Sequence, residues 1–230
     1  MPHIGLSDTT TASQLVTDSA AGMTAIVTGE KTHNGVISQS AMAVRKKSDG
    51  EPLKTILEYA EERGLATGVI TNDALTGATP AATYAKANDR GMTAHIFQQI
   101  FTPRFGDGVD VMIGAGRPAV AAALKEASLD LDAVSQKGGR PVLKTFSEIP
   151  DGATRALVML DSGEFDLQTA VDRTLRMLCG NPRGYFLMVE WDTHTDHVRL
   201  GLDRFVTLDR VIARTAQRVG SDTLVLFTAD

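Results

Sequence analysis

The sequence predicts an α/β fold in which a mainly parallel sheet is covered by helices on both faces. Short, almost continuous apolar runs alternate along the chain with segments of helical periodicity. Such runs are typical of strands buried on both faces, and their alternation with helices is typical of a parallel sheet. With 230 residues, 43% of them hydrophobic and 22% charged, the chain is long enough to bury the core of one domain.

Five apolar runs bounded by turn residues are predicted to be strands, and five segments with amphipathic periodicity are predicted to be helices. The predicted strands are Ala66–Thr71, Val109–Ile113, Arg155–Leu160, Tyr185–Glu190 and Thr223–Thr228. The predicted helices are Leu53–Arg63, Ala81–Asp89, Ala119–Ala127, Asp166–Leu178 and Leu202–Val219. Because ligands of parallel sheets gather at the carboxyl ends of strands, we expect the functional residues there.

Composition and charge argue against several classes of function. The net charge of −5 and the lack of a Lys/Arg stripe argue against nucleic-acid binding, and no apolar stretch is long enough to span a membrane. The single cysteine, Cys179, excludes an internal disulfide and is predicted to be a buried thiol. A third glycine is missing after Gly114 and Gly116, so we expect no dinucleotide cofactor.

An Asp-Ser pair, Asp18 and Ser19, opens a run of small residues that suit a helix. The Ser19 hydroxyl would then lie beside the N–H groups of a helix N-terminus, where the helix dipole favours an anion. The same pair is also typical of a plain N-cap, and spacing alone favours that interpretation.

The segment from residue 18 to residue 35 resembles the nucleophile region of alkaline phosphatases, because the Asp-Ser pair leads into Thr28-Gly29-Glu30-Lys31-Thr32-His33-Asn34-Gly35. Met23 departs from the Gly or Ala usual in the family. The resemblance covers essentially the whole chain and implies a three-layer sandwich. It also implies that the family's first strand and last zinc ligands lie outside the chain, so we expect residues 1–230 to form a single partial domain lacking N- and C-terminal parts.

A Thr-Pro pair follows the first predicted strand and predicts a helix start, with Thr79 as the cap and Pro80 in the first helical position. The resemblance implies that Thr79 ligates magnesium and that Arg90, eleven residues later, clamps the substrate phosphate. It also implies that Asp18 orients the Arg90 side chain. Gly77 stands where the family has an Asp or His that helps to organise the magnesium site. A magnesium ion therefore stays possible, with one ligand fewer.

A dense polar cluster follows the fourth predicted strand, and its carboxylates and imidazoles are donors that zinc accepts. The resemblance assigns Glu190 to magnesium, His194 to zinc, and Asp192 to zinc as the best carboxylate candidate. In an alternative, Glu190 itself has moved onto zinc. The resemblance also implies that Asp230 binds the second of two zinc ions.

By this resemblance, zinc activates Ser19 by direct coordination, and Ser19 forms a phosphoserine during phosphomonoester hydrolysis. The implied ligands are phosphomonoesters and inorganic phosphate, and no nucleic-acid partner is expected. The complete protein is expected to form a homodimer. A periplasmic or extracellular location is expected, although no signal peptide is visible. Two other functions stay open: a related phosphodiesterase or sulfatase, which the spacing of Thr79 and Arg90 disfavours, or a fragment that binds metal or phosphate without turnover.

Overall fold

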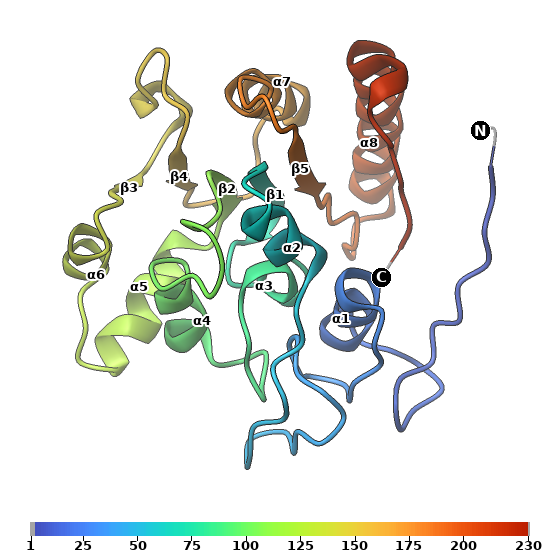
Figure 1. The fold of residues 1–230 in the computed structure, drawn as a ribbon, viewed down its shortest axis with the longest axis vertical. Helices are drawn as coiled ribbons and strands as arrows, with labels where there is room; N and C mark the ends of the chain where they lie inside the picture. The colour runs from blue at the N-terminus through green and yellow to red at the C-terminus, as the bar shows by residue number, and fades with distance from the viewer. Residues whose placement is uncertain (1–2, 230) are drawn as a thin grey trace.

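A computed structural model describes residues 3–229 and shows one parallel sheet between two layers of helices (Figure 1). The strands are β1 (Ala66–Ala74), β2 (Val111–Ala115), β3 (Val142–Leu143), β4 (Ala156–Met159) and β5 (Tyr185–Val189). Their order in the sheet is β3-β4-β2-β1-β5, and every pairing is parallel. The predicted fold class is confirmed.

Eight α-helices accompany the strands in the described part of the chain. They are α1 (Ser19–Thr28), α2 (Ile56–Glu62), α3 (Ala78–Tyr84), α4 (Thr93–Gln99), α5 (Arg117–Glu126), α6 (Leu131–Lys137), α7 (Leu167–Leu178) and α8 (Val198–Val219). Helices α7 and α8 lie on one side of the strands, and α1, α3, α4 and α5 lie on the other (Figure 1).

Strand residues alternate between the two faces of the sheet, which explains why the strands read as continuous apolar runs. In β1, Val69 packs into the core beneath α1, α3, α4 and α5, whereas its neighbour Ile70 packs against α7. In β2, Met112 faces the first of these cores and Ile113 faces the second. The sheet therefore has a hydrophobic core on each face, as period-2 side-chain alternation requires.

Four of the five predicted strands are present, but the prediction of a strand at Thr223–Thr228 is wrong. This segment forms no ladder with any described strand, and Leu224 and Leu226 are each 81% exposed. The nearest strand in sequence, β5, ends the sheet and pairs only with β1. An apolar run becomes a strand only where a neighbouring backbone supplies its hydrogen bonds, and no described segment does so here.

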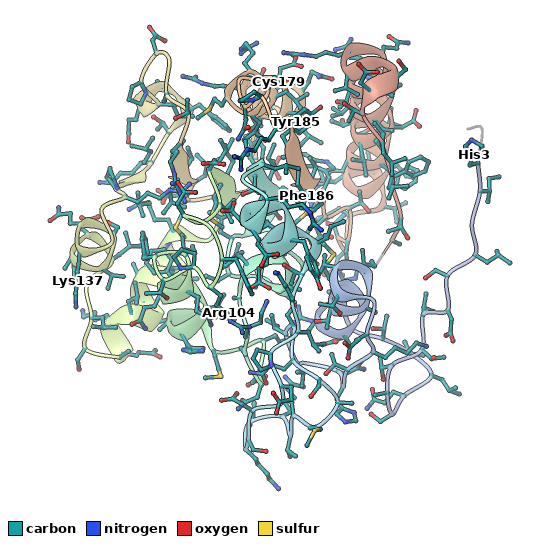
Figure 2. The ribbon with its side chains drawn as sticks, viewed as in Figure 1. His3, Arg104, Lys137, Cys179, Tyr185 and Phe186 are labelled. Carbon is teal, nitrogen blue, oxygen red and sulfur yellow. The ribbon has the colours of Figure 1, made fainter. Side chains whose placement is uncertain are left out.

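Several predicted helices have different bounds, and in two of them local hydrogen bonds set the end. Helix α2 begins after Thr55, whose side chain forms a capping box with Glu58. Helix α3 ends at Tyr84 instead of residue 89 because Ala87 pairs antiparallel with Ile37. Cys179, predicted to be buried, is exposed at the end of α7 (Figure 2).

Candidate active site

Asp18 is the N-cap of α1, and its carboxylate is held from two directions. Oδ1 accepts a hydrogen bond from the Ala21 N–H at 3.0 Å, and Oδ2 accepts one from the Gly35 N–H at 2.9 Å. The Asp18 N–H in turn donates to the side-chain oxygen of Asn34 at 3.1 Å. The loop around Asn34 and Gly35 therefore fixes the start of α1 in one position.

Arg90 lies against this helix start. Its Nη1 is 3.2 Å from Asp18 Oδ2, and its backbone N–H donates to the Gly35 carbonyl at 2.7 Å. The Arg90 side chain is 37% exposed, and half-buried Ser19 is the first residue of α1. The structure thus gathers Asp18, Ser19 and Arg90 at a positive helix end, which suits an anion with several oxygen atoms. The N-cap interpretation also holds, because Asp18 is the cap.

A second group of polar side chains lies at the carboxyl ends of β1 and β5. The Thr71 hydroxyl donates to Glu190 Oε2 at 2.5 Å, and the Glu190 N–H donates to the Ile70 carbonyl at 2.8 Å. Parallel pairing of β1 with β5 brings these residues together, because it aligns Ile70 with Val189. The Glu190 side chain is therefore anchored at the edge of the sheet.

The Asn72 side chain ties the loop after β5 to the end of β1. Its Nδ2 donates to the Asp192 carbonyl at 2.9 Å, and its Oδ1 accepts from the Asp192 N–H at 2.6 Å. The Asp192 carboxylate accepts the His194 N–H at 2.7 Å, and the His194 side chain is exposed. We call this pair of Asn72 hydrogen bonds the Asn72 latch.

The predicted zinc ligands do not come together in the described part of the chain. Between residues 3 and 229, no group of three or more His, Cys, Asp or Glu side chains is placed to hold a metal ion. Asp230, predicted as a ligand of the second zinc, lies outside the described residues. Among residues 3–229 there is therefore no complete three-ligand set for zinc.

The two residues predicted to bind magnesium, Thr79 and Glu190, both lie in ordered surroundings. Thr79 is buried in the first turn of α3, and Glu190 is anchored by Thr71. The prediction that Thr79 caps this helix is wrong, because α3 begins at Ala78 and Gly77 is its N-cap. A hydroxyl and a carboxylate are hard oxygen donors, which suit magnesium.

Sequence reasoning missed three residues that organise these groups, namely Asn34, Thr71 and Asn72. Asn34 was part of the motif from residue 28 to residue 35, and Asn72 directly follows a predicted strand. A polar residue at the carboxyl end of a buried strand was the available signal for Thr71 and Asn72. Their partners lie more than 100 residues away in sequence, so the pattern did not identify them.

A cluster of buried and partly buried charges lies at the opposite end of the sheet. Glu61 accepts from the Thr67 hydroxyl at 2.5 Å, Asp110 accepts from the Thr67 N–H at 2.8 Å, and burial raises the pKa of both carboxyls. Arg140 donates to the carbonyls of Val109, Asp110 and Ala156, and burial lowers its pKa to about 10. These residues hold the amino ends of β1, β2 and β4 together and are distant in the fold from Glu190.

Comparison with known proteins decides the family. The family model described as "Alkaline phosphatase" matches residues 1–152. The chain belongs to the alkaline phosphatase family. It is 34% identical to alkaline phosphatase 4 of Drosophila melanogaster over 128 residues, or 50% of this chain and 22% of that protein. It is 26% identical to the human tissue-nonspecific isozyme over 291 aligned positions, which cover all of this chain and 55% of that protein.

Solved alkaline phosphatases share the fold. The Thermus thermophilus enzyme superposes with a TM-score of 0.77 at 27% identity, covering 92% of this chain and 46% of that one. A variant of the TAB5 alkaline phosphatase, described as having magnesium bound in its M3 site, superposes with a TM-score of 0.75 at 23% identity, covering 92% of this chain and 62% of that one. The chain thus spans about half the length of the relatives that it matches throughout.

Proposed function

We propose that this chain carries the nucleophile and phosphate clamp of a phosphomonoester hydrolase. The observation that carries the proposal is the ion pair of Arg90 and Asp18 at the start of α1, beside Ser19. The Asp18 carboxylate joins two positive groups, the N-terminus of α1 and the Arg90 guanidinium, so a phosphoryl group bound beside Ser19 would have both near its oxygen atoms. The relatives named above are alkaline phosphatases, and phosphomonoesters are the substrate class of the family.

In the proposed reaction, the Ser19 Oγ attacks phosphorus and loses its proton as the ester P–O bond breaks. The leaving alcohol takes up a proton, and a phosphoserine remains on Ser19. Arg90 stabilises the charge on the non-bridging oxygen atoms, and Asp18 holds the Arg90 fork in place. Water then cleaves the phosphoserine, releasing inorganic phosphate and restoring the hydroxyl.

Magnesium is the metal that the described donors suit, with Thr79 and Glu190 as the residues that would hold it. When bound, it would supply positive charge that stabilises anionic groups in the site. Zinc binding through Asp192, His194 and Asp230 stays a prediction of the family resemblance.

We infer that the chain forms a single partial domain, because one sheet lies between the two hydrophobic cores and contributes side chains to both. Among residues 3–229, none of the helices combines the length and the hydrophobicity of a membrane-spanning segment. A homodimer and an exported location remain expectations from the family.

The test is phosphoenzyme trapping. The chain is incubated with a ³²P-labelled phosphomonoester, zinc and magnesium, quenched in acid, and compared with Ser19→Ala and with a control, Ser221→Ala, whose hydroxyl is exposed. We expect label on the chain and on the control and none on Ser19→Ala. Label that persists in Ser19→Ala would show that another residue is the nucleophile.

Two further substrates separate the competing functions. Bis(p-nitrophenyl) phosphate and p-nitrophenyl sulfate are offered beside p-nitrophenyl phosphate. Preference for the monoester supports the proposal, whereas preference for the diester or the sulfate supports the related hydrolases. If the chain binds inorganic phosphate, loses this binding in Arg90→Ala and hydrolyses none of the three substrates, the result supports a fragment that binds phosphate without turnover.

A further inference from the structure

The Asp73 carboxylate occupies the space that a side chain at position 77 would need. A Cβ built on Gly77 would lie 2.8 Å from Asp73 Oδ2 and 2.9 Å from the Ala74 carbonyl oxygen. The first distance is too short for a real contact, so any side chain at position 77 would displace the carboxylate. Position 77 is where the family resemblance expects an Asp or His at the magnesium site. A carboxylate is therefore present at this place, although it comes from a different residue.

An irregularity in β1 brings Asp73 there. Ile70 pairs with Ile113 and Ala74 pairs with Ala115, so β1 has three residues between these pairs where β2 has one. Extra residues in a strand bend it and change the direction of its side chains, often next to active sites. Asp73 is exposed as a result, although residues 66–72 of the same strand are buried. Solvent can therefore reach its carboxylate.

Thr71 connects Asp73 to the anchored glutamate. The Thr71 hydroxyl oxygen accepts the Asp73 N–H at 2.9 Å while its proton goes to Glu190 Oε2 at 2.5 Å. The backbone of Asp73 and the carboxylate of Glu190 are thus fixed to one hydroxyl. Thr79 follows Gly77 by two residues, in the first turn of α3.

We propose that Asp73 replaces the missing side chain at position 77 as an oxygen ligand of a divalent cation of the magnesium class, together with Thr79 and Glu190. The proposal rests on the function proposed above, because it names a ligand of the same site. Two carboxylates, a hydroxyl and retained waters match the preference of magnesium for hard oxygen donors.

The test follows Mn²⁺ binding to the whole chain by electron paramagnetic resonance, with Mg²⁺ as competitor. Asp73→Asn keeps the shape of the side chain and removes its charge. The double variant Asp73→Ala/Gly77→Asp moves the carboxylate to position 77 and removes the contact with Asp73 Oδ2, while the Ala74 carbonyl oxygen, 2.9 Å from a Cβ at position 77, still has to shift. Asp151→Ala removes an exposed acidic residue elsewhere and serves as the control. Circular dichroism verifies that each variant is folded.

We expect Asp73→Asn to weaken Mn²⁺ binding about tenfold or more, as loss of a coordinating or orienting group does. The double variant should bind within a few-fold of the unmodified chain, and the control should be unchanged. Unchanged binding in Asp73→Asn overturns the proposal, and tighter binding in the folded double variant than in Asp73→Asn supports it.

The failure of this inference is distinguishable from failure of the proposed function, because Mn²⁺ binding is measured without turnover. A chain that binds Mn²⁺ through Asp73 but never labels Ser19 overturns the proposed function alone. A chain that labels Ser19 while its Mn²⁺ binding ignores Asp73 overturns the ligand assignment alone.

Discussion

Removal of the Asn72 latch should release the loop that carries Asp192 and His194. In Asn72→Ala the two hydrogen bonds to the Asp192 backbone are lost, and Asn72 is only 8% exposed, so water does not fully replace them. At about 1 kcal/mol for each bond, local opening becomes easier by about 2 kcal/mol. Since 1.36 kcal/mol corresponds to a factor of ten, hydrogen exchange at the Asp192 amide should be about 30-fold faster.

The assay is native-state hydrogen exchange followed by mass spectrometry of peptides that cover residues 190–197. Asn181→Ala is a matched control, because the Asn181 side chain also makes one donor and one acceptor bond with backbone groups, to Gly64 and Arg183, at the other end of β5. The control should leave residues 190–197 unaffected. Equal exchange in Asn72→Ala and the unmodified chain would refute the argument that the latch fixes this loop.

Two further predictions concern the charged cluster at the amino ends of the strands. Arg140→Met should lower the free energy of unfolding by about 3 kcal/mol, because three carbonyls lose a charged donor, and urea unfolding measures it. Glu61→Gln should flatten the pH dependence of stability. The folded-state pKa of Glu61 is raised, so its stabilising contribution is complete below pH 4.5 and is lost as pH rises through the folded-state value.

Each of these predictions has its own control. Arg140→Lys keeps the charge but lacks the planar guanidinium, so it should lose most of the unfolding free energy that Arg140→Met loses. A Lys variant as stable as the unmodified chain would contradict the role of the planar guanidinium. Glu62→Gln removes the charge of a neighbouring residue whose side chain is 51% exposed and pairs with Lys54 at 2.7 Å, and it shows whether loss of any acidic side chain on α2 has the same effect. If Glu61→Gln loses as much stability above pH 4.5 as the unmodified chain, Glu61 is not the group that titrates.

Periodicity was enough to predict most of the fold. Val69 and Ile70 show why, because adjacent apolar residues serve opposite faces of a buried strand and leave a recognisable run. The segment Thr223–Thr228 has the same composition but lacks a partner strand in the described structure, and composition does not report pairing. The two-residue strand β3 was too brief for the pattern to indicate, and helices α4 and α6 were not predicted although they are as long as α2 and α3.

The candidate site was predictable where it depends on local sequence and the family resemblance. Asp18 was predicted as a possible cap from its neighbours, and Arg90 from its offset to Thr79. The role of Asp73 depends on three residues of β1 facing one residue of β2, which is a property of strand register. Likewise, Asn72 acts on a backbone 120 residues away. Interactions that arise from register and long-range pairing leave no local sequence pattern.

The free edge of β5 has a consequence for work with this chain in solution. Among the described strands β5 pairs only with β1, so the hydrogen-bonding groups of its other edge face away from the sheet. Exposed Leu224, Leu226 and Phe227 add apolar surface in the segment after α8. An unpaired strand edge and exposed apolar side chains both promote edge-to-edge self-association. Concentrated samples will therefore need conditions that oppose aggregation, and a charged residue in place of Leu226 is a direct way to provide them.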